Sequence, residues 1–210
     1  MKLIEKNCIE FTEALSSKAS IPGGGGASAL VGALGTALAS MVCNLTIGKK
    51  KYAIYEDDIK KILNRAVEIQ EKFLKMVDED AENFLPLSKA YGLPSDTEEQ
   101  KNEKDKILEE ALKLACKTPI QIVKASYEAI KLHEELVEKS SKLVISDIAV
   151  GVQFLRSTLI SGQINVMINI NMIKDREYVK KVKSEIEKLV IEGIEIADMV
   201  YKKIEDILSE

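Results

Sequence analysis

The chain has few of the side chains that bind metals or form nucleophilic pairs. It contains one histidine, His133, three cysteines and no tryptophan. No cysteine pair has zinc-ligand spacing, and a Ser-His-Asp triad would have to use His133 without a nucleophile-elbow pattern. We therefore expect no metal and no metal-dependent chemistry. Because Glu134 and Glu135 follow His133, we expect this histidine to be solvated at the surface.

A large excess of charge of either sign is also missing. Thirty basic and 34 acidic residues give a net charge of −4, which provides no electrostatic basis for a general nucleic-acid partner. The first six residues already carry charge, so we expect no secretory signal. Cys8, Cys43 and Cys116 are widely spaced and lie in apolar surroundings, and we expect them to be reduced core thiols of a cytoplasmic protein.

Charged residues are absent altogether between Lys18 and Lys49. The interval begins with Gly23, Gly24, Gly25 and Gly26, each of which costs a helix about 1 kcal/mol relative to alanine. We interpret these glycines as a turn that approaches another group closely, with bare amides and with φ free to be positive. The following residues, to position 47, are expected to form a helix with small residues on one face. These residues are Ser28, Gly32, Gly35, Ala39 and Cys43.

The same interval is long enough to span a bilayer, which needs about 20 apolar residues. It is rich in alanine and glycine, however, and it contains Ser40, Asn44 and Thr46 without an aromatic residue at its start. We expect no membrane partner, and we interpret the segment as a central helix that its neighbours bury on all sides.

The rest of the chain shows helical periodicity, and its four prolines stand where helices are expected to begin or end. Helices are expected over about 3–18, 27–47, 56–85 and 119–139, from 146 onward, and over most of 177–208. A further helix is expected to carry the apolar residues from Ile107 to Ala115, after a sequence at Thr97–Gln100 that resembles a capping box. With 46% hydrophobic residues, the chain should form one domain, 1–210. The expected fold class is all-α: a single-domain helical bundle of about seven helices around an uncharged central helix.

The sixth expected helix carries a polar stripe in an otherwise apolar segment. Steps of three or four residues place on one face Asp147, Gly151, Phe154, Thr158, Gly162, Asn165 and Asn169. The spacing favours a helix cap for Asp147 over a site carboxylate, and a structural hydrogen-bond network for Asn165 and Asn169 over a pocket wall.

Two charged clusters have a structural and a functional interpretation. Lys49, Lys50 and Lys51 can complement the dipole of the preceding helix or, together with the glycine turn, bind an anionic molecule. The acidic run of Asp78, Glu79, Asp80 and Glu82 is interpreted as a solvated face in preference to a site.

Several motifs resemble those of one family. They are Ile21-Pro22-Gly23-Gly24-Gly25-Gly26-Ala27-Ser28, Thr46-Ile47-Gly48-Lys49-Lys50-Lys51-Tyr52, Asp80-Ala81-Glu82-Asn83-Phe84, Ser146-Asp147, and Asn165 to Ile170 followed by Lys174-Asp175. In these motifs the chain resembles the cyclodeaminase/cyclohydrolase family of folate enzymes, over essentially its whole length.

The resemblance implies an all-helical cytoplasmic homodimer that acts on a tetrahydrofolate derivative and needs no other cofactor. Members hydrolyse methenyltetrahydrofolate to formyltetrahydrofolate or convert formiminotetrahydrofolate to the methenyl species with release of ammonia. Without a formiminotransferase domain, this chain fits the cyclohydrolase better. A non-catalytic helical dimerisation module is the alternative of another class.

The residues and the resemblance together give each motif an expected role. Asp147 would stabilise the methenyl cation and accept a proton from water, while the amides of Asn165 and Asn169 orient water or the pterin. The remaining expected substrate-binding residues are Gly23, Gly24, Gly25, Gly26 and Ser28 at the turn, and Lys49, Lys50 and Lys51 at the anionic glutamate tail.

Overall fold

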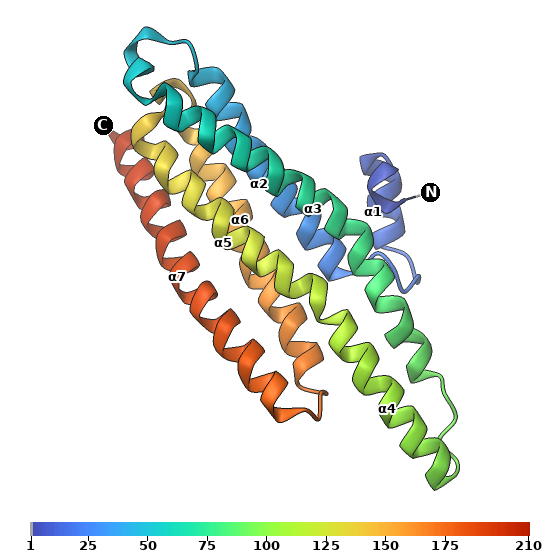
Figure 1. Cartoon of the computed structure of the whole chain (residues 1–210). Coiled ribbons are helices and arrows are strands. Elements are labelled where there is room, and N and C mark those ends of the chain that lie inside the picture. Colours follow the sequence, from blue (N-terminus) through green and yellow to red (C-terminus); the bar gives the residue numbers. More distant parts are fainter. Residues whose placement is uncertain (1) are drawn as a thin grey trace.

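Long helices run side by side along the molecule in this computed structural model, which describes residues 2–210 (Figure 1). They are α1 (Cys8–Leu15), α2 (Gly24–Thr46), α3 (Glu56–Tyr91), α4 (Glu98–Ala115), α5 (Lys117–Lys139), α6 (Ile145–Ile170) and α7 (Arg176–Ser209). Short 3₁₀ turns occupy Leu3–Glu5, Lys50–Tyr55 and Lys142–Val144. These described residues contain no strand, so the predicted all-α fold class is confirmed.

The helix α2 is central because its small residues let neighbouring helices approach closely. It packs against α3, α5 and α6. A Cβ on Gly32 would lie 2.5 Å from the Phe73 ring of α3, and one on Gly35 would lie 2.9 Å from Leu155 of α6. Larger residues at these two positions would push the helices apart. The predicted small-residue face of α2 is therefore a packing surface.

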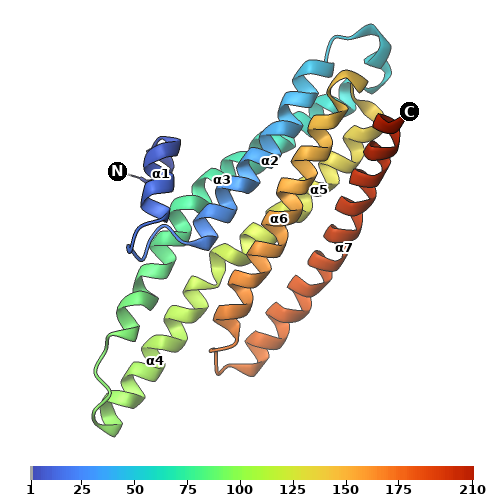
Figure 2. The ribbon, with the colours of Figure 1, turned by 180° about the vertical axis from the view of Figure 1, so that it is seen from behind.

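One face of α2 is nevertheless open, so the expectation that its neighbours bury it on all sides is wrong. Leu34 is 52% exposed, and Leu45 is also exposed. Val150 and Phe154 of α6 continue this surface. Figure 2 shows α2 and α6 side by side with no helix crossing in front of them. We call the surface made by these four residues the uncharged face.

Two segments, Gly24–Thr46 and Lys142–Ile170, are long and apolar enough to cross a membrane by length and composition alone. The most apolar stretch of the first is 61% buried inside the protein and that of the second is 39% buried. Core helices of soluble proteins have the same character, so this composition does not by itself indicate a membrane protein.

The expected surface position of His133 is wrong. Its side chain is fully buried, with Nδ1 2.9 Å from the carbonyl oxygen of Ala129. His133 follows Ile130 by three residues and therefore shares the inward stripe of α5. Gly151 leaves room for the ring, because a Cβ there would lie 2.3 Å from Nε2. Burial lowers the pKa of His133 to about 4.

Three further expectations need correction. Cys8 is exposed, whereas Cys43 and Cys116 are buried. The first expected helix is interrupted, because the Asn7 side chain caps α1 by accepting the Glu10 amide at 2.9 Å. The helix α3 continues through Pro86 to Tyr91, and Leu87 and Ala90 beyond the proline are buried in the core. Their packing outweighs the hydrogen bond that the proline removes.

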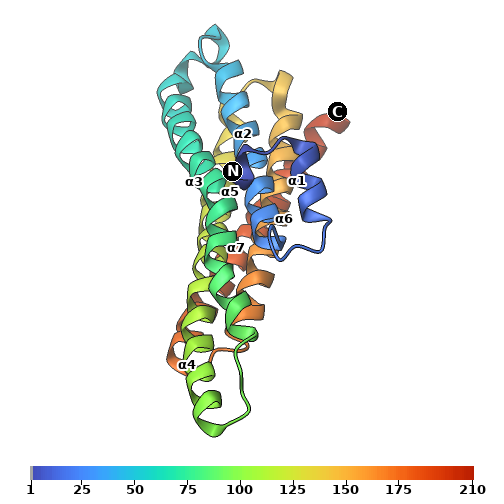
Figure 3. The same cartoon turned by 90° about the vertical axis from the view of Figure 1, so that its right-hand side faces the viewer.

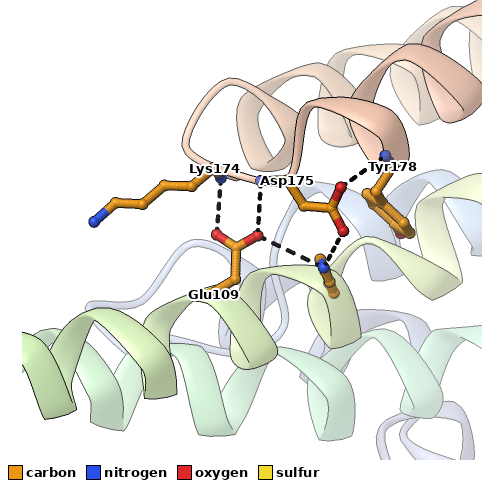
Figure 4. A network of polar contacts seen from close by, with 5 residues as sticks. Glu109, Lys174, Asp175 and Tyr178 are labelled. Carbon is orange, nitrogen blue, oxygen red and sulfur yellow. Dashed lines mark hydrogen bonds and ion pairs between the residues drawn. The ribbon is translucent and has the colours of Figure 1, made fainter.

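Polar contacts fix the turn between α6 and α7 to α4 (Figure 4). The Glu109 carboxylate accepts the backbone amides of Lys174 at 2.8 Å and Asp175 at 3.0 Å. Asp175 in turn accepts the Tyr178 amide, which caps α7, and the Lys113 ammonium at 2.7 Å. This network holds the C-terminal end of α6 in place.

The short helix α1 stands to one side of the bundle in Figures 1 and 2, and in Figure 3 it lies toward the viewer. Phe11 is its only buried residue. The segment before it is tied to α3, because the Leu3 amide donates to the Asp78 carboxylate at 2.6 Å.

The close fit of His133 against α6 predicts a large effect of one added methyl group. Gly151→Ala should lower the free energy of unfolding by about 1–3 kcal/mol, because a fully buried ring cannot move aside. Gly92→Ala is the control, since its nearest contact would be an ordinary 3.5 Å from the Lys89 carbonyl oxygen. Urea unfolding measures both variants, and equal midpoints would contradict the packing argument.

Burial of His133 also predicts a pH effect. The unfolded chain binds a proton near pH 6.5, whereas the folded chain binds it only near pH 4. Stability should therefore fall as the pH drops through this window, by up to about 1.4 kcal/mol per pH unit from this group. His133→Gln removes the titration. Its unfolding free energy should depend less steeply on pH, and parallel curves for the two proteins would contradict the prediction.

Candidate active site

A cleft of about 230 Å³ lies at the N-terminal end of α2. Four parts of the chain form its walls: the segment before α2 with the first turn of α2, the middle of α3, the junction of α4 and α5, and the C-terminal end of α6. We call it the glycine cleft. Its lining residues are Ser20, Ile21, Gly23, Gly24, Gly25, Asp80, Phe84, Ala115, Pro119, Asn165, Ile168 and Asn169.

The Asp80 carboxylate lies directly against the first turn of α2. Its Oδ2 accepts the Gly26 amide at 2.9 Å. A Cβ on Gly25 would lie 2.2 Å from Oδ1, so only glycine leaves room for this carboxylate. The close approach predicted for the glycine turn is therefore present, and the group that approaches is Asp80.

Burial raises the pKa of Asp80 above its usual value, while the hydrogen bond from Gly26 opposes that shift. The positive end of the α2 dipole also favours the charged form. Asp80 is therefore a half-buried carboxylate at the wall of the cleft, and its pKa is raised above its usual value. Such a group can accept a proton or stabilise a cation.

The expectation that the acidic run is a solvated face holds for Glu79 and Glu82 but is wrong for Asp80. A signal for Asp80 was present in the helical spacing. It follows the buried residues Met76 and Val77 by four and three positions, so it lies on the inward stripe of α3.

Asn165 and Asn169 line the cleft on the α6 side. The side-chain amide of Asn165 donates to the backbone carbonyl of Ser161 at 2.8 Å. The side-chain amide of Asn169 donates to the backbone carbonyl of Asn165 at 2.9 Å. Among residues 2–210, neither side-chain oxygen accepts a hydrogen bond. The asparagines therefore combine a local bond within α6 with free acceptors in the cleft, rather than forming a network between helices. Gly24 is adjacent, since a Cβ there would lie 3.7 Å from the Asn165 amide.

The backbone of the glycine turn differs from the expectation. Gly24, Gly25 and Gly26 form the first turn of α2 itself, and among the described residues only Gly48 has a positive φ. The glycines therefore contribute to the cleft through their small size, which leaves room for Asp80, and not through a positive φ. The Ser28 hydroxyl donates to the Gly24 carbonyl at 2.6 Å, so it supports this turn and is largely buried.

The lysine cluster lies beyond the other end of α2. We call Gly48–Tyr55 the lysine loop. Lys49 donates to the Ser141 hydroxyl at 2.9 Å, and the Tyr52 hydroxyl accepts the Lys142 amide at 3.1 Å. Lys50 and Lys51 are exposed. The loop is therefore tied to the start of α6, with two ammonium groups in solvent.

Asp147 lies in the first turn of α6, next to the lysine loop and far from the glycine cleft. It is half-buried, and its carboxylate accepts no hydrogen bond from residues 2–210, so no cap by this side chain is seen. Along α6, 18 residues separate it from Asn165, which corresponds to about 27 Å. One chain thus brings the glycines, Asn165 and Asn169 together but leaves Asp147 and the lysines at the opposite end.

Potential metal ligands are also dispersed. Within residues 2–210, no three histidine, cysteine, aspartate or glutamate side chains group as a metal ion would require.

Comparison with known proteins places this geometry in a family. The formiminotransferase-cyclodeaminase family model matches residues 7–188. The methenyltetrahydrofolate cyclohydrolase of Methylorubrum extorquens is 39% identical over 92% of this chain and 93% of its own length. The formimidoyltransferase-cyclodeaminase of Rattus norvegicus is 26% identical over 97% of this chain, which spans 38% of that protein.

The fold also matches a solved structure. The crystal structure of formiminotetrahydrofolate cyclodeaminase from Thermotoga maritima superimposes with a TM-score of 0.81 over 99% of this chain and 98% of that one, at 24% identity. The family model and the cyclohydrolase relative, each of which matches most of the chain, show that it belongs to the formiminotransferase-cyclodeaminase family.

Proposed function

We propose that this chain is a methenyltetrahydrofolate cyclohydrolase, with the glycine cleft as its reaction site. The observation that carries the proposal is the half-buried Asp80 carboxylate, held against the start of α2 beside the free acceptors of Asn165 and Asn169. The substrate's methenyl carbon belongs to an amidinium cation, which is electrophilic without a Lewis acid. A carboxylate and two amide oxygens suit that cation and the water that attacks it.

The reaction can be written on these residues. Water adds to the methenyl carbon, and Asp80 accepts the proton that the water loses. One ring carbon–nitrogen bond then breaks and the nitrogen takes up the proton from Asp80. The hydroxyl group on the carbon loses its remaining proton to solvent as the formyl C=O forms, so the reaction releases one proton overall. A raised pKa suits Asp80 to both proton transfers. Within one chain, Asp80 rather than Asp147 is placed beside the asparagines and can act as the base.

Formiminotetrahydrofolate cyclodeaminase is the second candidate, because relatives named formimidoyltransferase-cyclodeaminase match nearly the whole chain. The cyclohydrolase is favoured because that relative is more similar and matches over nearly the full length of both proteins. Assays of the purified protein on both substrates, following the methenyl chromophore, test the choice. Loss of the chromophore on hydrolysis supports the cyclohydrolase, whereas its formation from the formimino substrate supports the cyclodeaminase.

Asp80→Asn tests the assigned base directly. Asparagine can still accept the Gly26 amide, so the fold should survive, but the charge and the base are lost. Turnover should fall by about 10²–10⁴-fold, the usual contribution of a general base. Glu82→Gln is the matched control, because Glu82 is exposed on the same helix two residues away. Near-normal turnover in a folded Asp80→Asn protein would exclude this role.

The proposed enzyme needs no metal. Few histidine or cysteine side chains are accessible as metal ligands, since His133 and two of the three cysteines are buried in the core. Activity should therefore survive prolonged chelation followed by gel filtration. Loss of activity that added zinc restores would contradict this part of the proposal.

The proposed protein is a cytoplasmic homodimer. Support comes from the uncharged face, where apolar side chains of α2 and α6 lie open in one chain. Burying such a surface in a symmetric dimer is favourable, because the same patch can pack against itself. The non-catalytic dimerisation module would use the same face but would bind no folate, so a thermal shift with tetrahydrofolate derivatives separates the two.

A further inference from the structure

We propose that Asn83 and Thr118 are a positioning pair for the reaction in the glycine cleft: their hydrogen bond holds the start of α5 against α3 and so keeps the cleft closed around Asp80. The inference rests on the proposed function, because it explains how the assigned base is kept in its surroundings. Neither residue of the pair lines the cleft, so both act through their neighbours.

The pair joins two helices directly behind the cleft wall. The side-chain amide of Asn83 donates to the hydroxyl oxygen of Thr118 at 2.9 Å, and the two residues are 35 positions apart in the sequence. Each is followed by a residue that lines the cleft, Phe84 on α3 and Pro119 on α5. The hydrogen bond therefore fixes the separation of these two walls.

Thr118 uses its hydroxyl group differently from other threonines inside the helices. The usual bond runs from the hydroxyl to the carbonyl four residues earlier in the same helix, and it is made by Thr12, Thr36, Thr46 and Thr158. Thr118 is buried but makes no such bond within residues 2–210, and its hydroxyl oxygen accepts a hydrogen bond from α3. A buried hydroxyl that bonds to a neighbouring helix specifies how the two helices pack.

The contact between α3 and α5 has little other polar support near the cleft. Within residues 2–210, two further polar side-chain contacts join these helices, the ion pairs Asp58–Lys139 and Arg65–Glu128. Arg65 lies 15 residues before Asp80, about 22 Å along α3. Both ion pairs are partly exposed, and such pairs add little to stability. The Asn83–Thr118 bond is therefore the polar contact that sets the packing of α3 on α5 beside Asp80.

Asp80 depends on these walls for its chemistry. Among the described residues that line the cleft, it is the one titratable side chain. Burial raises its pKa, while the hydrogen bond from Gly26 opposes that shift. Asp80 precedes Asn83 by three residues, so both lie on the same side of α3. Loosening α5 from α3 would admit water to the carboxylate and lower its pKa, because a hydrated carboxylate keeps its charge more easily.

Neighbouring charges do not account for the environment of Asp80. The helix α2 carries none, and α6 contributes the neutral Asn165 and Asn169 to the cleft. The charged side chains nearest to it on the other packed elements are exposed or already engaged in a contact: Asp78, Glu79 and Glu82 on α3, Lys113 on α4 and Lys117 on α5. Closure of the cleft walls is therefore what keeps Asp80 basic.

Removing the hydroxyl group with little change of shape tests the pair. Thr118→Val should fold, because Asn83 is only half-buried and water can accept its amide. In this variant the pKa of Asp80 should fall toward its usual value. Titration of the carboxyl carbons by NMR measures this pKa without substrate, and Asp80→Asn identifies the Asp80 signal. Asn83→Ala removes the other partner and should shift the pKa in the same direction.

The activity assay gives a second readout. The acidic limb of kcat/KM should move to lower pH in both variants, because a weaker base is deprotonated at lower pH. Turnover should fall by about 10- to 100-fold, since a displacement of about 1 Å can cost about 100-fold. Because both residues act through one bond, the double variant Asn83→Ala, Thr118→Val should have about the same turnover as the more impaired single variant.

Two further variants separate positioning from stability. Thr118→Ser keeps the hydroxyl group and should restore the wild-type pH profile. Ser126→Ala removes a buried hydroxyl of α5 that donates within its own helix, to the Ile122 carbonyl at 2.8 Å. This control should leave the pKa of Asp80 and turnover unchanged. Urea unfolding of every variant reports any loss of stability independently.

Three outcomes would overturn the proposal. They are a wild-type pKa of Asp80 in folded Thr118→Val or Asn83→Ala protein, additive losses of turnover in the double variant, and failure of both single variants to fold, which would make the bond a requirement of the fold itself. If the pKa of Asp80 shifts as expected but the wild-type protein has no folate activity, the proposed function alone fails. If the wild-type protein is active and the pKa does not shift, the positioning pair alone fails.

Discussion

The small size of the side chains along one face of α2 is the constraint on which the rest of the structure depends. Gly32 and Gly35 let α3 and α6 pack almost against the α2 backbone, and Gly151 does the same for the His133 ring between α5 and α6. Close packing of this kind leaves little freedom for a helix to slide or rotate. The ends of α2 are therefore held at fixed positions relative to α3 and α6, and both ends carry polar groups that require such precision. A rigid scaffold is what keeps the Asp80 carboxylate at hydrogen-bond distance from one particular amide.

Glycines at the N-terminal end of α2 also determine the environment of the Asp80 carboxylate. A carboxylate next to a helix start is normally stabilised in its charged form, and its pKa falls. At Asp80 burial prevails and the pKa is raised, although Gly26 donates to it. The Gly25 position explains how both effects coexist, because only glycine lets the carboxylate press against the helix while the cleft walls shield it from water. Asp80 is thus held in place by the amide and kept basic by its burial.

The sequence predicted the helical framework well because periodicity and the missing charge are local signals. The family resemblance assigned Gly23 to Gly25, Asn165 and Asn169 to one substrate, and these residues line one cleft. The sequence prediction failed at His133 and Asp80 for a common reason. Each stands in a run of charged neighbours that resembles a solvated surface, but each lies three residues after a buried residue on the same stripe, Ile130 and Val77 respectively. The position of a residue on the buried side of its helix was therefore a better guide to its burial than the charge of its neighbours in sequence. The separation of Asp147 from the cleft depends on how α2 and α6 pack, which no local pattern contains.

The uncharged face resolves why an apolar helix of membrane-like composition belongs in a chain that is otherwise 30% charged. A helix buried only by its own chain needs apolar residues on its inward side alone, and polar residues would serve on its open side. In α2 the open side is apolar as well, with Leu34 half-exposed. Apolar residues on that side are unfavourable in water and become favourable once another surface covers them. The missing charge between Lys18 and Lys49 thus has two consequences: close packing inside the chain, and an apolar open side that suits the proposed dimer.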